Sequence, residues 1–343
     1  MQENGREFTV RGMKMSPFFS GLSAYLEPMS DTPTTRPSNA TVAPSGWGLR
    51  VLGILVPLAV AAVLLRRQLD AVPASAWSWS VEPLYFLAAL ALVPVNWGLE
   101  GFKWAELMPW GKLASRFRQV LYGTAWSLIG PLRLGAVVGR VAAVHPRQRG
   151  QAVRAFATAS VSQWWCTITA AGLALLATDW WLLSAPVLGL SAVVLGLYFG
   201  WSPTFWKWIR NTRWTRQWRV ARRIATIRRR RALSLSILRY LVMLAQFVLL
   251  LWAFGHLDHW DIADQFMAQM AGAAGMWGLT SLAPFPLLGD LGLREAAAML
   301  TLPTPLPADV TAIVGATLSL WVINLLLPAI VGLIWQWSVF RRR

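Results

Sequence analysis

Two ionisable residues stand inside an otherwise apolar run, in a pattern that places them on one face of a helix. Asn96, Glu100 and Lys103 recur at i, i+4 and i+7, and Glu100 can pair with Lys103 one turn later. Ionisable groups inside a lipid bilayer are costly unless they are paired or hydrated, so they are candidates for a functional role. The alternative is a structural ion pair near the end of the segment, where the Lys103 side chain reaches the interface.

Two arginines follow a Gly-Pro break in the chain. Arg133 and Arg140 are seven residues apart, so they share one face of a helix that begins after Gly130 and Pro131. Two guanidinium groups facing one cavity suit a phosphate or another anionic headgroup, because each can donate two parallel hydrogen bonds. The alternative is that both side chains only extend to the membrane interface.

A third charged cluster precedes a strongly helical run. Asp290 lies four residues before Arg294, so the two can form an ion pair on one helix face, and Glu295 adds a second carboxylate. Asp290 can also cap that helix, and capping with an ordinary ion pair is the alternative explanation. We predict that the substrate-binding residues are Arg133, Arg140, Asp290, Arg294, Glu295, Glu100 and Lys103.

The composition indicates which elements position these side chains. The 343 residues are 56% hydrophobic and 14% charged, which is typical of a membrane protein and not of a water-soluble domain. Spanning helices of roughly 20 residues are expected at about 49–65, 83–107, 152–177, 180–200, 233–255 and 310–340. Two further segments, 116–144 and 262–302, are interrupted by Gly and Pro. The predicted fold is an all-α polytopic membrane protein with about six full spans and two re-entrant helical hairpins, or alternatively with eight spans.

The two broken segments occupy corresponding places in two halves, about 47–200 and 233–343. The loop that joins the halves, 201–232, is rich in arginine and is therefore expected in the cytoplasm, together with both termini. The first hairpin then enters from the cytoplasm and the second from outside. This is the plan of an inverted repeat, in which broken helices line a transport site. We expect a multi-pass protein of the cell membrane, either plasma or inner.

The N-terminal stretch 1–46 is rich in Ser, Thr and Pro and has no sustained periodicity. We expect it to be a disordered tail, with residues 47–343 forming a single transmembrane domain. We also expect translation to start at Met29, which opens a cleaner tail.

Several function classes are not expected. The net charge of +17 does not indicate nucleic-acid binding, because no soluble module carries a basic face. The single cysteine, Cys166, allows no intramolecular disulfide. The His and Asp residues at 256–261 are expected to be solvated, so no metal and no other cofactor is predicted. No hydrolase, zinc-protease or nucleotide-binding motif occurs in its required context, so no enzymatic activity is predicted.

Four segments, in this order and spacing, resemble a known family. They are "NWGLEGFKWAELM" from Asn96, "GPLRLGAVVGR" from Gly130, "RAFATASVSQWW" from Arg154 and "APFPLLGDLGLREAAAML" from Ala283. Over roughly residues 49–340 the chain resembles the flippase-like family related to the transmembrane region of lysylphosphatidylglycerol synthases.

The resemblance is uneven between the two hairpins. The matching positions are Pro131, Arg133, Gly135 and Arg140 in the first and Gly289, Gly292, Arg294 and Glu295 in the second. Ala136 stands where the family has a glutamate, and Ser162 with Gln163 stands where it often has a Glu-Arg pair. These departures remove charged groups that the resemblance would otherwise imply.

The resemblance implies movement of lipids or lipid-linked molecules between leaflets. Because the sequence carries no soluble aminoacyl-transferase domain, lysine transfer is not expected. We expect a flippase-like transporter whose partners are anionic membrane lipids. The alternative is a noncatalytic membrane scaffold that partners an envelope-biosynthesis or lipid-modifying enzyme, with its polar residues serving helix packing.

Overall fold

A computed structural model describes most of the chain after residue 80. The described residues are Arg66 and the ranges 81–129, 134–176, 181–199, 224–255, 262–282, 292–302 and 307–340. They belong to one compact unit, Val51–Arg343. The predicted tail 1–46, the first predicted span and most of the basic loop 201–232 lie outside the described residues.

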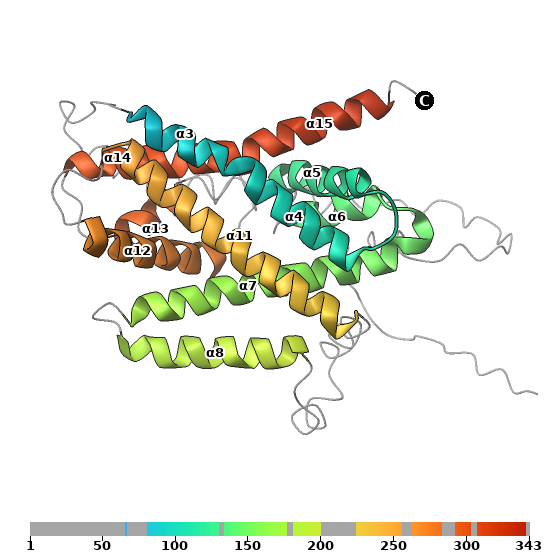
Figure 1. The fold of residues 1–343 in the computed structure, drawn as a ribbon, viewed down its shortest axis with the longest axis horizontal. Helices are drawn as coiled ribbons and strands as arrows, with labels where there is room; N and C mark the ends of the chain where they lie inside the picture. The colour runs from blue at the N-terminus through green and yellow to red at the C-terminus, as the bar shows by residue number, and fades with distance from the viewer. Residues whose placement is uncertain are drawn as a thin grey trace, which may run out of the picture. The chain divides into compact units, whose positions relative to one another are not determined.

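The described ranges are helical and contain no strand, which confirms the predicted all-α class for this part of the chain. The α-helices are α3 (Pro83–Ala91), α4 (Val93–Leu107), α5 (Leu113–Ile129), α6 (Leu134–Ala142), α7 (Arg149–Leu175), α8 (Trp181–Phe199), α11 (Thr226–Ala253), α12 (Ile262–Leu282), α13 (Leu293–Thr301), α14 (Pro307–Trp321) and α15 (Leu327–Phe340). A 3₁₀ turn, η3 (Pro146–Gln148), precedes α7, and a π-helical turn, η5 (Val322–Leu326), joins α14 to α15. Figure 1 shows their arrangement.

Four described helices are long and apolar enough to cross a membrane. They are Pro83–Leu107, Trp181–Phe199, Thr226–Ala253 and Val310–Trp335. Each overlaps a segment that the sequence predicted to span, although α11 begins at Thr226, inside the stretch predicted as loop. The predicted span 152–177 corresponds to α7, which has 27 residues but is not among these four. A multi-pass helical membrane protein fits these helices.

The bundle has an apolar core, but it also exposes many large apolar side chains and buries several polar ones. Large apolar side chains such as Leu84, Leu182 and Ile334 are more than 60% exposed, whereas Lys103 and Gln246 are buried. Lipid tails are as apolar as leucine, so exposed apolar side chains carry no penalty in a bilayer and polar side chains favour contact with one another. The buried polar groups are therefore where specific interactions concentrate.

Two proline positions interrupt spanning helices. α3 and α4 meet at Leu92, where Pro94 in the first turn of α4 lacks a backbone donor. In the last span, the π turn η5 directly precedes the turn that holds Pro328. A proline cannot donate to the carbonyl four residues earlier, here that of Asn324, so the wider turn forms at that point.

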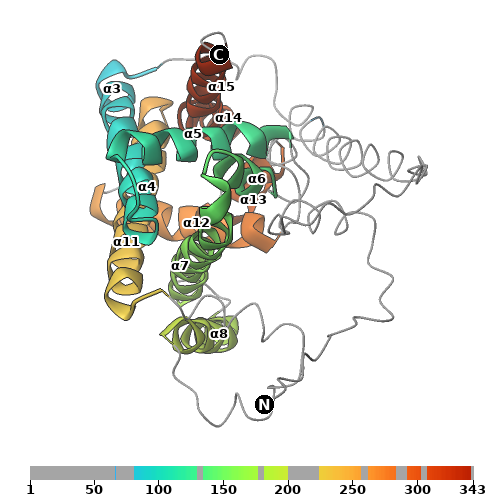
Figure 2. The same cartoon turned by 90° about the vertical axis from the view of Figure 1, so that its right-hand side faces the viewer.

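The first broken segment folds into a helix pair. α5 packs against the short helix α6 (Figure 2), and the predicted Gly130-Pro131 break falls in the stretch between them, outside the described residues. A Cβ atom added to Gly135 would collide with the Trp126 backbone, and one added to Gly139 would lie 2.5 Å from the Tyr122 carbonyl oxygen. These glycines let the two backbones approach closely.

The second broken segment repeats this arrangement. α12 packs against the short helix α13, and the Thr301 hydroxyl donates to the Gly272 carbonyl at 2.7 Å. A Cβ atom on Gly272 would lie 2.8 Å from the Thr301 carbonyl oxygen. Both α6 and α13 have nine residues, or about 13 Å of helix.

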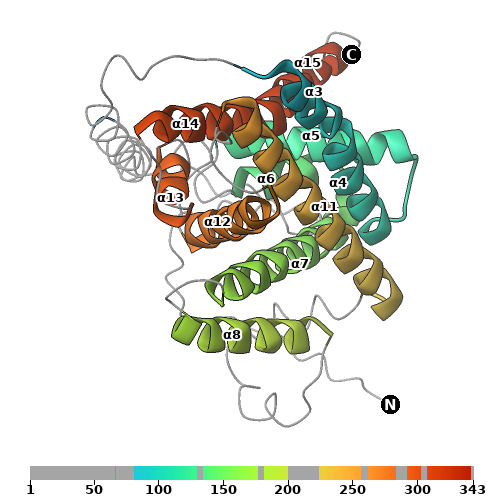
Figure 3. The same cartoon turned by 60° about the vertical axis from the view of Figure 1, so that its left-hand side comes forward.

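The two halves also share one packing pattern. In the first, α4 contacts α5 and α7, and α6 contacts α7; in the second, α11 contacts α12 and α14, and α13 contacts α14. Between the halves, α4 packs along α11, α7 on α12, and α5 on α15 (Figures 1 and 3). Exchanging α4 for α11, α5 for α12 and α7 for the last span maps these contacts onto one another.

Replacing Gly135 with alanine tests the close approach of α5 and α6. The added methyl group would meet the Trp126 backbone, and overpacking of this kind costs about 1–3 kcal/mol. We expect the thermal unfolding midpoint of the detergent-purified protein to fall. Gly98→Ala is the matched control, because nothing lies within 4 Å of its added Cβ, and the better helix propensity of alanine should hold or raise that midpoint. Equal midpoints for the two variants would contradict the described packing.

Candidate functional site

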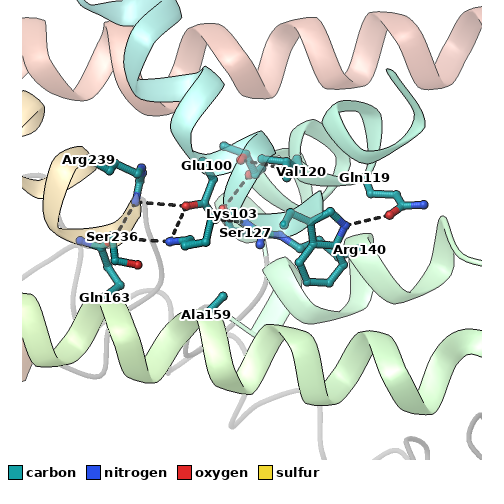
Figure 4. A network of polar contacts seen from close by, with 12 residues as sticks. Glu100, Lys103, Gln119, Val120, Ser127, Arg140, Ala159, Gln163, Ser236 and Arg239 are labelled. Carbon is teal, nitrogen blue, oxygen red and sulfur yellow. Dashed lines mark hydrogen bonds and ion pairs between the residues drawn. The ribbon is translucent and has the colours of Figure 1, made fainter. Parts of the chain in front are cut away.

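An ion cluster centred on Glu100 lies inside the bundle. On α4, the Lys103 Nζ is 2.7 Å from the Glu100 Oε2, as their spacing predicted. Arg140 approaches from α6, with its Nη2 2.8 Å from the Glu100 Oε1. The Glu100 side chain is only 12% exposed and that of Lys103 2%, so water screens these ion pairs weakly. Figure 4 shows the group.

Arg140 is held by aromatic rings as well as by Glu100. Its guanidinium carbon lies 5.0 Å from the centre of the Trp104 ring and 5.4 Å from that of Phe156. A Cβ on Gly123 would lie 2.6 Å from the Arg140 Cγ, so the glycine on α5 leaves room for this side chain. The sequence placed Arg140 on a helix after the break, and the structure assigns it these partners.

Two members of the cluster were missed by the sequence analysis. On α11, the Arg239 Nη1 lies 3.4 Å from the Glu100 Oε2. On α7, the Gln163 side-chain oxygen accepts from Arg239 at 3.2 Å and from Lys103 at 3.5 Å. Gln163, which stands where the resembled family often has a charged residue, is thus an acceptor that bridges Arg239 and Lys103. Arg239 is the one charged residue in the predicted span 233–255. A lone charge inside a span is a sequence signal for a functional residue.

The cluster is rich in positive charge. Its described members contribute three cations and one carboxylate, Glu100. The Nε groups of Arg140 and Arg239 are buried, and neither has a hydrogen-bond partner among the described residues. Buried donors in proteins are normally satisfied, so these two N–H groups would favour contact with an acceptor oxygen. The arrangement can bind an anion.

A hydrogen-bonded layer supports the Arg140 side of the cluster. The Trp104 Nε1 donates to the Gln119 side-chain oxygen at 2.8 Å, and Arg116 donates to the same oxygen at 3.0 Å. Both Gln119 and Arg116 belong to α5. The indole ring under the Arg140 guanidinium is therefore fixed by the first hairpin itself.

A chain of amides crosses the bundle at another level. The Asn96 Nδ2 donates to the Asn324 Oδ1 at 2.5 Å, and the Asn324 Nδ2 donates to the Gln246 Oε1 at 3.1 Å. Gln246 in turn donates to the Ala89 carbonyl at 3.1 Å. This chain joins α4 and α11 to the π turn η5. The spacing predicted Asn96 on the same helix face as Glu100, but its partners come from segments distant in the sequence.

The predicted residues of the second hairpin are only partly described. Arg294 and Glu295 are buried on α13, and Asp290 lies outside the described residues, as does Arg133 of the first hairpin. The Glu295 Oε2 accepts from the Gly292 N–H at 2.5 Å, where Gly292 adopts a φ of 83°. Glu295 therefore caps its own helix, and the capping role predicted for Asp290 as one alternative stays a prediction.

No family model, curated protein or solved structure matches this chain in comparisons with known proteins. Within the described ranges, no group of three or more His, Cys, Asp or Glu side chains is placed to hold a metal ion. The His and Asp residues at 256–261 lie outside those ranges. The function must therefore be argued from the Glu100 cluster itself.

Replacing Glu100 with glutamine tests whether the cluster is an integrated unit. Three cations would lose their shared carboxylate, and breaking a buried ion pair costs about 3 kcal/mol or more. We expect a large fall in the thermal unfolding midpoint. In the control Glu106→Gln, the pair lost is the exposed one with Arg231, worth less than about 1 kcal/mol. If Glu100→Gln unfolds no earlier than this control, the three cations do not depend on Glu100.

Proposed function

We propose that this protein is a flippase-like translocase for lipids or lipid-linked molecules with anionic headgroups. The observation that carries the proposal is the Glu100 carboxylate, which is surrounded inside the bundle by Lys103, Arg140 and Arg239. An uncompensated positive charge at membrane depth is costly. An anionic headgroup reduces that cost while it occupies the site.

The chemistry of the cluster favours phosphate or carboxylate oxygens. Guanidinium groups present planar sets of donors that match both anions. The Nε atoms of Arg140 and Arg239 lack acceptors among the described residues, and charge-assisted hydrogen bonds to them would be stronger than neutral ones. A transported headgroup must also leave the site. Glu100 is an internal counter-ion that would pair with the cations again once the headgroup has left.

Neutral donors lie in the core of the same bundle. The Tyr240 hydroxyl and the indole N–H groups of Trp97, Trp165 and Trp277 are buried without acceptors in the described part of the chain. All four side chains belong to, or pack against, one hydrophobic cluster. The oxygen atoms of water or of a passing headgroup would satisfy them. They would add neutral donors to the charged donors of the Glu100 cluster.

The cluster lies well away from the helix ends. Glu100 is seven residues before the end of α4 and Arg239 thirteen residues after the start of α11, or about 10 and 20 Å along those helices. Both helices are candidate spans. A headgroup that reaches the cluster has therefore entered the apolar layer, which is the costly step of leaflet exchange.

The repeated packing pattern supports the finer topology that we propose: six full spans and two re-entrant hairpins in an inverted repeat. α6 and α13, at about 13 Å, are less than half as long as the roughly 30 Å hydrocarbon core. The protein would lie in the cell membrane, with the arginine-rich loop and both termini on the cytoplasmic side. In inverted-repeat transporters, broken helices of this kind lie beside the substrate.

The family resemblance points to the same function, and the absence of a nucleotide-binding motif in the sequence favours facilitated or ion-coupled exchange. The rival proposal is a scaffold for an envelope-biosynthesis enzyme. In a scaffold the cations would serve packing alone, and leaflet exchange would not respond to their number.

Leaflet exchange of labelled lipids in proteoliposomes tests the proposal. We expect exchange of an anionic lipid, such as phosphatidylglycerol, to slow by about tenfold for each arginine removed in Arg140→Gln and Arg239→Gln. A hydrogen bond to a charged group contributes about 1.5–3 kcal/mol, which corresponds to such a factor. Exchange of a zwitterionic lipid should change less.

Two controls make the assay specific. Arg147→Gln removes an exposed arginine from η3 and should leave exchange unchanged, and Arg140→Lys should retain part of the rate because it keeps the charge. If the Arg140→Gln/Arg239→Gln double variant exchanges anionic lipid at the wild-type rate, the cluster is not the transport site. If the wild-type protein moves none of a panel of anionic lipids, the result contradicts the translocase proposal and favours the scaffold.

A further inference from the structure

A groove separate from the Glu100 cluster lies where α4 ends and α11 begins. Its volume is about 580 Å³, and its lining includes Phe102, Glu106, Pro109, Ile227, Arg228 and Arg231. The two helices run antiparallel, since the Glu82 N–H at the start of α3 donates to the Ala253 carbonyl at the end of α11. The groove is therefore at one end of two candidate spans.

The groove combines an apolar wall with a cationic edge. Phe102 and Ile227 are about half exposed and lie on facing helices, and Leu235 continues the wall two turns further along α11. Arg228 and Arg231 are one turn apart and so share the same face of α11. Side chains at the end of a spanning helix meet the boundary between headgroups and acyl chains. A phospholipid presents the same sequence of chemistry, an anionic phosphate above an apolar chain.

The charge in the groove is not balanced. Arg231 forms an exposed ion pair with Glu106, with 3.4 Å between the Arg231 Nη1 and the Glu106 Oε1. Arg228 makes no ion pair with any described residue. One carboxylate thus faces two guanidinium groups, which leaves donors for one further anion.

The neighbouring arginines have different surroundings. Arg229 is buried and donates to the Tyr198 carbonyl at 2.6 Å, while the Tyr198 hydroxyl donates to the Arg229 carbonyl at 2.9 Å. Arg230 is exposed and is not part of the groove. Within this run of four arginines, only Arg228 and Arg231 line the groove.

We propose that this groove binds the phosphate of an anionic phospholipid from the adjacent leaflet, with Arg228 and Arg231 on the headgroup and with Phe102 and Leu235, which lie further from the helix ends, along the start of an acyl chain. The site would hold lipid at the edge of the bundle before it moves toward the Glu100 cluster. In naming the lipid that enters, the inference rests on the proposed translocase, but lipid binding itself can be measured without transport.

Native mass spectrometry of the full chain in mixed micelles tests the site. The protein is equilibrated with equal amounts of phosphatidylglycerol and phosphatidylcholine, and the ratio of the two bound lipids is measured. We expect Arg228→Gln and Arg231→Gln each to lower this ratio by about fivefold, which is the contribution of one basic residue near an anionic surface. Arg230→Gln, the matched control from the same helix end, should leave it unchanged.

A fourth variant should act in the opposite direction. Glu106→Gln removes the carboxylate that competes for Arg231, so the ratio of phosphatidylglycerol to phosphatidylcholine should rise. Because a damaged protein would not gain lipid, this increase does not depend on the stability of the arginine variants. The proposal fails if Arg230→Gln lowers the ratio as much as Arg228→Gln does, or if Glu106→Gln leaves it unchanged. Either result would leave the leaflet-exchange test of the Glu100 cluster intact.

Discussion

One shared carboxylate holds together the parts of the bundle that matter most. Glu100 on α4 pairs with cations from α4, α6 and α11, and Gln163 on α7 joins two of those cations. Three helices therefore meet at the Glu100 side chain, and a fourth, α7, contacts two of its cations. Ion pairs in a medium of low dielectric constant are strong, but they require every member to stay in place. Arg140 of the first hairpin and Arg239 of α11 both pair with Glu100, so this carboxylate links the position of the hairpin to that of α11.

The hairpins can take part because their arms lie close together. Gly135 and Gly139 bring α6 against α5, and Gly123 leaves room for the Arg140 side chain that reaches Glu100. In the second hairpin, Gly272 has the corresponding role at the α12–α13 contact. Small residues thus do in both hairpins what hydrophobic burial does in a water-soluble core, because contact between backbones replaces contact between large side chains.

The sequence predicted the parts of this architecture that local pattern controls. Apolar runs identified the spans, the Gly-Pro break at 130–131 falls between α5 and α6, and helical spacing paired Glu100 with Lys103. It did not predict contacts between distant segments. Arg239 and Gln163 lie 139 and 63 residues after Glu100, and nothing in local periodicity brings them to the same place.

The same limit applies to the amide chain. Asn324, which accepts from Asn96, lies in the π turn of the last span, and π turns have no reliable sequence pattern. The start of α11 was also placed too late, since an arginine run at a helix end reads as loop although arginine is a good helix former. Polar partners in a bundle follow from tertiary packing.

The reciprocal hydrogen bonds between Tyr198 and Arg229 fix the end of α8 to the start of α11. The two ends of the connection between α8 and α11 are therefore held close together, which closes a loop in the chain. Closing such a loop becomes only slowly more costly as it lengthens, because the entropy of closure grows with the logarithm of its length. Natural or engineered insertions can lengthen this segment while the helices on either side keep their register.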